Sequence, residues 1–263
     1  MTGPLLTFEN VSKSFGGLAV IENLSFSVRR SSCTGLIGPN GAGKTTVFNL
    51  ITGVYPIDSG RILLDGVDIS KIPSRRRIHQ GIARNFQNIR LMPHLSALEN
   101  VLVGQHCRNS GFLGVLQPVN LWPGNRWREE ARAALNDAGL SQYERATVGS
   151  LPYGLQKRIE LVRALMAQPR LLLLDEPAAG LNPSETEALR ERITTICRDR
   201  GITLLVVEHD MPFVGALCAE VVVLNFGRKI AEGTPDQVRE DSLVREAYLG
   251  SDADAPDEQR HAS

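Results

Sequence analysis

The sequence contains no long apolar run: none of its apolar stretches approaches the roughly 18 residues that a membrane-spanning helix needs. Its first residues also lack the basic and apolar segments of an export signal. We therefore expect the chain to stay inside the cell. If it serves a membrane process, another polypeptide must supply the spans.

Neither sign of charge is in excess, because 29 Lys and Arg residues are matched by 29 Asp and Glu residues. Nothing therefore indicates nucleic acid as the main partner. Cysteine is scarce, and the four cysteines form no CxxC pair and no metal-like cluster with the five histidines: Cys33, Cys107, Cys197 and Cys218. We interpret them as reduced, small apolar residues of an intracellular protein. Hydrophobic residues make up 42% of the 263 residues, which is enough for a large core.

Short β-like runs separated by glycine-containing turns predict a small antiparallel sheet near the N-terminus. They are Leu5 to Val11, Ser25 to Val28 and Arg61 to Leu64. Between them, the apolar run Cys33 to Ile37 predicts a buried strand that leads into a glycine-rich loop. A helix is predicted to follow from Lys44 to Thr52, with Gly53 as its stop.

From about residue 93 to 165, apolar residues recur at three- and four-residue spacing, which predicts an inserted helical subdomain. Its helices are expected at Leu95 to Val103, Arg126 to Leu140 and Gln156 to Ala167. Two continuous apolar strands and a helical stretch between them follow, an order typical of a parallel sheet covered on both faces. They are Leu171 to Leu174, Pro183 to Arg200 and Ile202 to Val207.

The C-terminal part of the chain predicts a hairpin around Asn225 to Arg228 and a helix with a capping box that opens at Thr234. A last helix is expected to reach about Leu249, with Gly250 as its stop. The polar segment 251–263 has no apolar period and is expected to be disordered. One domain, 1–250, thus contains the helical insertion at about 93–165.

The glycine-rich loop has the residue pattern of a phosphate-binding loop. Its glycines permit a tight turn whose backbone N–H groups converge on phosphate oxygens, and the helix that follows adds its positive end. Lys44 is expected to reach the β- and γ-phosphates, and Thr45 to offer a hydroxyl ligand to Mg²⁺. The predicted nucleotide-binding residues are Gly38, Pro39, Asn40, Gly41, Ala42, Gly43, Lys44, Thr45 and Thr46. A glycine-rich turn without a ligand is the alternative, and the strand and helix around the loop argue against it.

Two carboxylates, Asp175 and Glu176, follow the apolar strand that begins at Leu171. Ligands of open α/β sheets bind at the carboxyl edge of such strands. We expect Asp175 to hold Mg²⁺ through water and Glu176 to act as general base on the water that attacks the γ-phosphate. The alternative is a solvated pair in which Glu176 only caps the next turn, but Pro177 and Gly180 indicate a fixed loop there.

With these motifs in this order, the sequence resembles the nucleotide-binding subunits of ABC transporters from about Leu5 to Gly250. The resemblance implies an α/β fold: a P-loop NTPase core with a parallel sheet, an N-terminal antiparallel β subdomain and an inserted α-helical subdomain. It also implies further site residues. Gln87 matches the Q-loop glutamine at the Mg²⁺ site, His209 matches the switch histidine that contacts the γ-phosphate, and Phe15 matches the aromatic that stacks on adenine. Taken alone, each has an ordinary reading: a loop amide, a strand-end histidine and a core ring.

The family signature, usually Leu-Ser-Gly-Gly-Gln, aligns with Leu151, Pro152, Tyr153, Gly154 and Leu155, and Gln156 continues it. Only Leu151 and Gly154 match. Because Pro152 has no hydroxyl and no backbone N–H, contact with the partner's nucleotide must come from the backbone around Gly154 and from the helix dipole. A purely structural role for this segment is the alternative. The D-loop also departs from the family, since it has Asn182 where aspartate is common.

The resemblance is closest to the ATPase subunits of branched-chain or hydrophobic amino acid importers. The matching strings are GPNGAGKTTVFNLITG, RNFQNIRL, LDEPAAGLNPSET and VVEHDM. The resemblance implies hydrolysis of Mg²⁺-bound ATP that powers solute import through two integral-membrane permease subunits, with an extracytoplasmic solute-binding protein as an indirect partner. The second ATPase of the dimer is expected to be a homologous subunit, with a second copy of this chain as the alternative. The chain is then cytoplasmic and peripheral on the inner face of the plasma membrane.

Other functions stay open at this point. An exporter ATPase of the lipopolysaccharide type has the same fold and is the nearest alternative, because the chain does not itself show import or export or the solute. A soluble ABC ATPase that acts on nucleic acid or ribosomes is less favoured, since the sequence has one nucleotide domain and no basic face. A small-molecule kinase or GTPase leaves the signature unexplained, and no Asn-Lys-x-Asp motif occurs.

Overall fold

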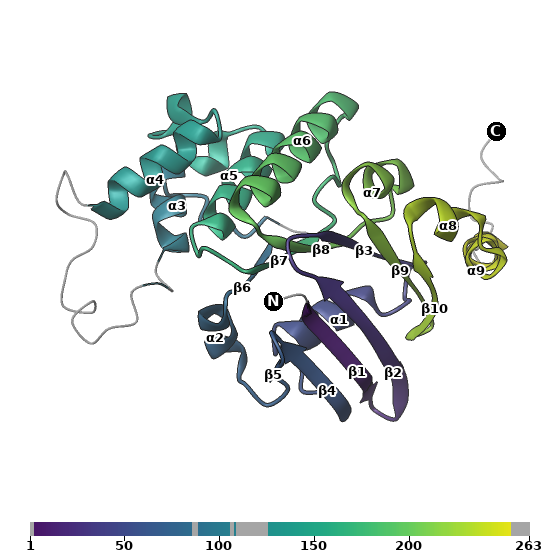
Figure 1. The fold of residues 1–263 in the computed structure, drawn as a ribbon. Coiled ribbons are helices and arrows are strands. Elements are labelled where there is room, and N and C mark those ends of the chain that lie inside the picture. The colour runs from purple at the N-terminus through teal and green to yellow at the C-terminus, as the bar shows by residue number, and fades with distance from the viewer. Residues whose placement is uncertain (1–2, 86–88, 106–107, 109–125, 254–263) are drawn as a thin grey trace, which may run out of the picture. The chain divides into compact units, whose positions relative to one another are not determined.

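The structure is a computed structural model that describes residues 3–85, 89–105, 108 and 126–253. The chain divides into two compact units. Unit 1 combines residues 1–71 with 207–263, and unit 2 comprises residues 72–206. Figure 1 labels the helices and strands of both units.

Unit 1 contains two sheets and four helices among its described residues. Its elements are β1 (Pro4–Phe15), β2 (Leu18–Arg29), β3 (Cys33–Ile37), α1 (Lys44–Ile51), β4 (Ser59–Leu64), β5 (Val67–Asp68), α7 (Met211–Leu217), β9 (Glu220–Asn225), β10 (Arg228–Gly233), α8 (Pro235–Glu240) and α9 (Ser242–Ala253).

The predicted N-terminal antiparallel sheet is confirmed, with strand order β2-β1-β4-β5. Its first two strands are longer than predicted and pair over most of their length. Phe8 and Phe26 face each other across this pair, with ring centroids 4.7 Å apart, so aromatic stacking pins the register. Side chains alternate between buried and more exposed along both strands, as expected for a sheet with one covered face.

The second sheet of unit 1 has the order β10-β9-β3. β3 has the predicted bounds and pairs in parallel with β9, whereas β9 and β10 form the predicted hairpin. The Thr234 capping box that opens α8 is confirmed, because Thr234 accepts from the Gln237 N–H and the Gln237 side chain accepts from the Thr234 N–H. The buried strand β3 ends at Ile37, and the glycine-rich loop begins at the next residue.

Unit 2 contains a short parallel sheet and helices. Its elements are α2 (Ser74–Arg77), the 3-10 turn Ile78–Gln80, β6 (Ile82–Asn85), α3 (Ala97–Gly104), α4 (Arg126–Asp137), the 3-10 turns Ser141–Tyr143 and Val148–Ser150, α5 (Tyr153–Leu165), β7 (Leu171–Asp175), α6 (Pro183–Arg200) and β8 (Thr203–Val207). The strand order is β8-β7-β6, and β6 pairs with β7 in parallel. β7 and β8 are buried at every residue, which is why their sequences read as continuous apolar runs.

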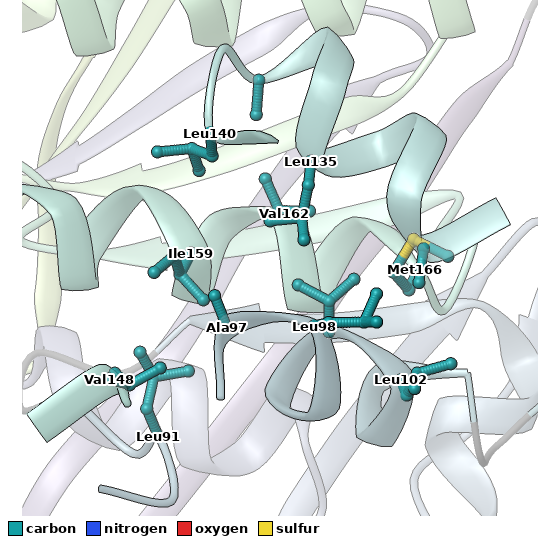
Figure 2. Close-up of a cluster of buried hydrophobic side chains, with 13 residues drawn as sticks. Leu91, Ala97, Leu98, Leu102, Leu135, Leu140, Val148, Ile159, Val162 and Met166 are labelled. Atoms are coloured by element: carbon teal, nitrogen blue, oxygen red, sulfur yellow. The ribbon is translucent and has the colours of Figure 1, made fainter. Parts of the chain in front are cut away.

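The helical part of unit 2 has its own hydrophobic core. Figure 2 shows Leu98 of α3, Leu135 of α4 and Val162 of α5 pointing toward one another. The predicted helices are confirmed, although α5 begins at Tyr153 rather than Gln156, and α4 ends before Leu140. α3 begins with a capping box in which Ser96 and Glu99 satisfy each other's backbone N–H groups.

In the described part of the chain, no helix is long and apolar enough to cross a membrane. Cys218 is buried, and Cys33 and Cys197 are half-buried. Cys33 and Cys218 bring their sulfurs to 3.0 Å of each other at the start of the β3 and β9 pair. Burial raises the pKa of the Cys197 thiol to about 12, so that it stays protonated. Cys107 lies outside the described residues.

Candidate functional site

The phosphate loop lies in unit 1 between β3 and α1. Gly38, Gly41 and Gly43 have φ values of +150°, +80° and +102°, which L side chains rarely adopt. Gly38 is also confined, since a Cβ built on it would lie 2.1 Å from the Leu224 carbonyl oxygen. At Gly41 nothing lies within 4 Å of such a Cβ, so this side of the loop is open. A tight loop with an open face is the cradle that a phosphate group needs.

α1 begins directly at the loop, with Gly43 as its left-handed N-cap and no acidic residue in its first turn. Its first N–H groups and positive dipole end are therefore available to an anion. Lys44 donates from Nζ to the carbonyl oxygens of Gly38 and Pro39, at 2.6 and 2.9 Å, so the ammonium lies at the loop itself. Thr45 is exposed and Thr46 half-buried. Asn40 is exposed at the tip of the loop, and Ala42 is buried beneath it.

Phe15 is the last residue of β1 and is 38% exposed. Its ring meets Tyr55 edge to face at 4.9 Å, and Lys13 Nζ lies 5.2 Å from its centroid. The alternative of a core ring is wrong, because Phe15 is exposed. Exposure of the ring is also what stacking on a base requires. Tyr55 was not singled out from the sequence, since an isolated aromatic after a helix carries no motif.

His209 follows β8 and precedes α7, also in unit 1. Its side chain is 67% exposed, and its Nδ1 lies 3.8 Å from a carboxylate oxygen of Glu208, which is buried. The His209 N–H donates to Glu208 Oε2 at 3.2 Å. Asp210 caps α7 by accepting from the Phe213 N–H at 3.1 Å. The His209 imidazole is thus exposed to solvent, while hydrogen bonds to Glu208 and Asp210 hold the backbone around it.

The carboxylate pair lies in unit 2, where β7 ends. Asp175 is buried and accepts from Arg84 Nη2 at 2.5 Å, and the two side chains are only 5% and 6% exposed. Charges so little exposed to water are stable only when paired and hydrogen-bonded. Arg84 belongs to β6, the strand beside β7, and its role was not recognised from the sequence because an arginine in a mixed strand gives no distinctive pattern.

Glu176 follows Asp175 in a left-handed backbone conformation, with φ +47°. A non-glycine residue in this region is uncommon and is often found at functional sites. Its side chain is half-buried. Gly180 has φ +78° in the loop that follows, as the predicted fixed loop after the strand requires.

The signature segment opens α5. Pro152 is the N-cap of this helix, and its carbonyl accepts from the N–H groups of Leu155 and Gln156. Gln156 also donates from Nε2 to the Leu151 carbonyl at 2.8 Å, which ties the segment together. Tyr153 is 45% exposed. The segment thus presents a helix N-terminus without a side-chain cap.

The signature packs on the D-loop of the same chain. A Cβ built on Gly154 would lie 2.6 Å from Glu185 Oε1, and a Cβ built on Gly180 would lie 3.1 Å from Tyr153 Cε1. Asn182 is the N-cap of α6, because its side chain accepts from the Glu185 N–H and its own N–H donates to Glu185. The amide that replaces the family's aspartate therefore has a local structural use.

Gln87 lies outside the described residues, and its role stays a prediction. The chain just after it is held by α5. Glu160 accepts from the Arg90 N–H at 2.9 Å, and Arg163 donates to the Arg90 carbonyl at 2.6 Å. Burial of Glu160 raises the pKa of its carboxyl, although these partners oppose the shift. The signature helix α5 thus hydrogen-bonds both the N–H and the carbonyl group of Arg90, just after the predicted Q-loop.

Tyr248 of α9 is a contact of the phosphate loop that the sequence did not reveal. Burial raises the pKa of its phenol, and the nearby Gly38 backbone opposes that shift. The last helix thus lies beside the first residue of the loop inside unit 1.

The donor set fits Mg²⁺ held together with a nucleotide. Thr45, Gln87 and Asp175 carry oxygen donors, which this hard cation prefers. Among the described residues, no group of three His, Cys, Asp or Glu side chains could hold a metal ion alone.

Comparison with known proteins gives consistent results along the chain. The family described as ABC transporter matches residues 21–179, and the family described as branched-chain amino acid ATP-binding cassette transporter matches residues 228–254. A solved ATP-binding cassette of an ABC transporter in its ADP conformation superposes with a TM-score of 0.84 at 32% identity, covering 95% of this chain and all of that one.

Two curated relatives differ in the transport they serve. The chain is 40% identical over 253 residues to BraF of Pseudomonas aeruginosa, a high-affinity branched-chain amino acid transport ATP-binding protein, with 95% of this chain and 99% of BraF covered. It is 34% identical over 246 residues to LptB of Haemophilus influenzae, a lipopolysaccharide export system ATP-binding protein, with 94% and 97% covered.

Proposed function

Because the chain belongs to the ABC transporter family and is thus an ATPase of α/β fold, we propose that it powers the import of branched-chain or other hydrophobic amino acids through a membrane permease. The observation that carries this proposal is the match of residues 228–254 to the branched-chain amino acid subgroup, which comes in addition to the general nucleotide motifs. The higher identity to BraF than to LptB favours import over export.

The nucleotide is proposed to bind with its phosphates on the loop at Gly38 to Thr45. The backbone N–H groups and the Lys44 ammonium supply fixed positive charge to the β- and γ-phosphates. Phe15 stacks on the adenine ring through its exposed face. These contacts bind ATP and orient its γ-phosphate.

Hydrolysis is assigned to the carboxylate pair and to His209. Glu176 accepts a proton from the attacking water, while Asp175, Thr45 and Gln87 hold the Mg²⁺ that accompanies ATP. When bound, the cation neutralises charge on the phosphate oxygens. Asp175 is already paired with Arg84, which suits a contact made through water rather than direct coordination. His209 contacts the γ-phosphate from its exposed position.

The partners in this proposal are a second ATPase subunit, homologous or identical, and two integral-membrane permeases, with a solute-binding protein acting indirectly. The signature of each ATPase subunit faces the nucleotide of the other. The chain then works as a peripheral subunit on the cytoplasmic face of the plasma membrane, and nucleic acid has no part in the cycle.

The test is reconstitution of the assembled transporter in proteoliposomes, with ATP hydrolysis and uptake of labelled leucine, isoleucine and valine measured together. We expect the parent to couple the two, and the Glu176→Gln and Lys44→Ala variants to lose both. Hydrolysis without uptake of leucine, isoleucine or valine would refute the assigned solute. Hydrolysis by the Glu176→Gln variant at the parent rate would refute the assigned base.

A further inference from the structure

The peptide that follows the proposed catalytic carboxylate is held from the signature helix. Lys157 lies on α5 and is 2% exposed. Its Nζ donates to the carbonyl oxygen of Glu176 at 3.4 Å. An ammonium this deeply buried is costly unless polar groups surround it, so its position is specific.

The conformation of Glu176 explains what such a contact does. Left-handed backbone is unfavourable for an L residue and persists only where neighbours hold it. On its N-terminal side, β7 and the Arg84 pair to Asp175 fix the chain. On its C-terminal side, the hydrogen bond from Lys157 fixes the carbonyl. Together they set the direction in which the Glu176 side chain leaves the backbone.

The same helix turn reaches the D-loop. Tyr153 lies four residues before Lys157, on the same face of α5, and Lys157 Nζ lies 5.5 Å from the centre of its ring. The ring also packs against Gly180, as described above. One turn of α5 therefore contacts the loop both at Glu176 and at Gly180.

We propose that Lys157 is a positioning residue for hydrolysis: it holds Glu176 in the backbone conformation that aims its carboxylate, and so connects the signature helix to the chain's own catalytic carboxylate. This inference rests on the proposed role of Glu176. Its consequence is that the helix addressed to the partner's nucleotide also fixes the base of this chain's own site.

The experiment uses the assembled transporter and compares Lys157→Met, which keeps length and apolar volume, with Lys157→Arg, which keeps a cation with donors. We expect Lys157→Met to lower kcat at least tenfold while the KM for ATP stays within about twofold, because the phosphate loop is untouched. Lys157→Arg should recover part of the loss. Lys71→Met, at an exposed lysine, is the matched control and should leave hydrolysis unchanged.

A double-mutant cycle separates positioning from a general loss of structure. If Lys157 acts through Glu176, Lys157→Met should lower hydrolysis no further when Glu176→Gln is already present. Further loss in that background, or a parent-like kcat in the single variant, would overturn the inference. Because Glu176→Gln is measured by itself, a failure of the proposed base appears separately from a failure of Lys157.

Discussion

Charged side chains buried in unit 2 lie beside the residues that carry the proposed chemistry. Arg84 pairs with Asp175, Lys157 reaches the Glu176 carbonyl, and Glu160 holds the chain after the predicted Q-loop. Charges removed from water contribute little net stability, and removing one partner is costly. We interpret these groups as fixing geometry at the cost of desolvation.

The pair of Arg84 and Asp175 gives a prediction for stability. The Arg84→Met change leaves a buried carboxylate without its cation, and we expect it to lower the free energy of unfolding by about 3–5 kcal/mol. Urea denaturation of both proteins measures the change. Arg198→Met is the control, since Arg198 and its partner Asp199 are largely exposed and such substitutions stay within about 0.5 kcal/mol. Equal losses in the two variants would contradict this view of the pair.

Glu160 gives a prediction for pH dependence. Burial raises the pKa of its carboxyl above the ordinary value of 4.5, so the folded chain binds a proton that the unfolded chain has lost as pH rises past that value. The contribution of Glu160 to stability therefore falls with rising pH until the folded group ionises, and is constant above that point. The neutral Glu160→Gln variant lacks this fall.

The measurement is urea denaturation of parent and Glu160→Gln from about pH 4.5 to 7. The free energy of unfolding of the variant, minus that of the parent, should increase as pH rises through this range. Taking the difference between the two proteins removes the titration of all other groups. A constant difference would show that Glu160 titrates alike in both states.

At this scale, the sequence predicted residues whose neighbours form a motif and missed those placed by tertiary packing. Asp175 and Glu176 follow an apolar run that only a buried strand explains. By contrast, Arg84 and Lys157 occur in stretches with many charged residues, where most side chains are solvated. Only the pairing of β6 with β7 and the packing of α5 show that these two are buried.

Among the elements, α4 depends on few apolar contacts, because Ala131 and Leu135 are its buried residues. Leu135 packs with α3 and α5 in the cluster of Figure 2. We expect Leu135→Ala to destabilise the protein by about 2–5 kcal/mol through lost burial and the cavity left behind. Leu243→Ala, at an exposed leucine, should change stability by less than about 0.5 kcal/mol. Urea unfolding distinguishes them, and a similar effect of both would contradict the assigned core.

Elements with strong local signals were predicted well. β3 and α6 have the predicted bounds, since an apolar run and a capped helix with proline at its start are unambiguous. β6 and α7 were missed: β6 has four residues and mixes polar with apolar side chains, and α7 is a short helix. β6 forms because it pairs with β7, a tertiary contact, and α7 is stabilised by its Asp210 N-cap, a local hydrogen bond.

At the scale of the whole molecule, the residues proposed to serve this chain's own nucleotide belong to both units, because Asp175 and Glu176 lie in unit 2. The phosphate loop, Phe15 and His209 belong to unit 1, whereas the signature at the start of α5 belongs to unit 2. In the proposed dimer this signature serves the partner's nucleotide. Its quality therefore affects the partner's site more than the site at Lys44.

The departure at Pro152 then predicts two unequal sites in a heterodimer. The partner's signature serves the Lys44 site in full, but the partner's site receives a helix N-terminus with no hydroxyl at position 152. Removing the catalytic glutamate from this chain, by Glu176→Gln, should therefore cost more hydrolysis than the same change in the partner. Equal losses in the two single variants would contradict the prediction.

Restoring the family residue tests the cause of that inequality. Pro152 occupies the N-cap of α5 without a side-chain hydrogen bond, and serine is among the best N-cap residues, so Pro152→Ser suits the backbone as it stands. We expect this variant to raise affinity for the γ-phosphate at the partner's site, measured as ATP-dependent association of the two ATPase subunits in the Glu176→Gln background. Pro73→Ser, the same change at the exposed proline N-cap of α2, serves as control and should not strengthen association. If Pro152→Ser left association unchanged, the loss of the serine hydroxyl would not explain any inequality between the sites, and the backbone around Gly154 would be a sufficient contact by itself.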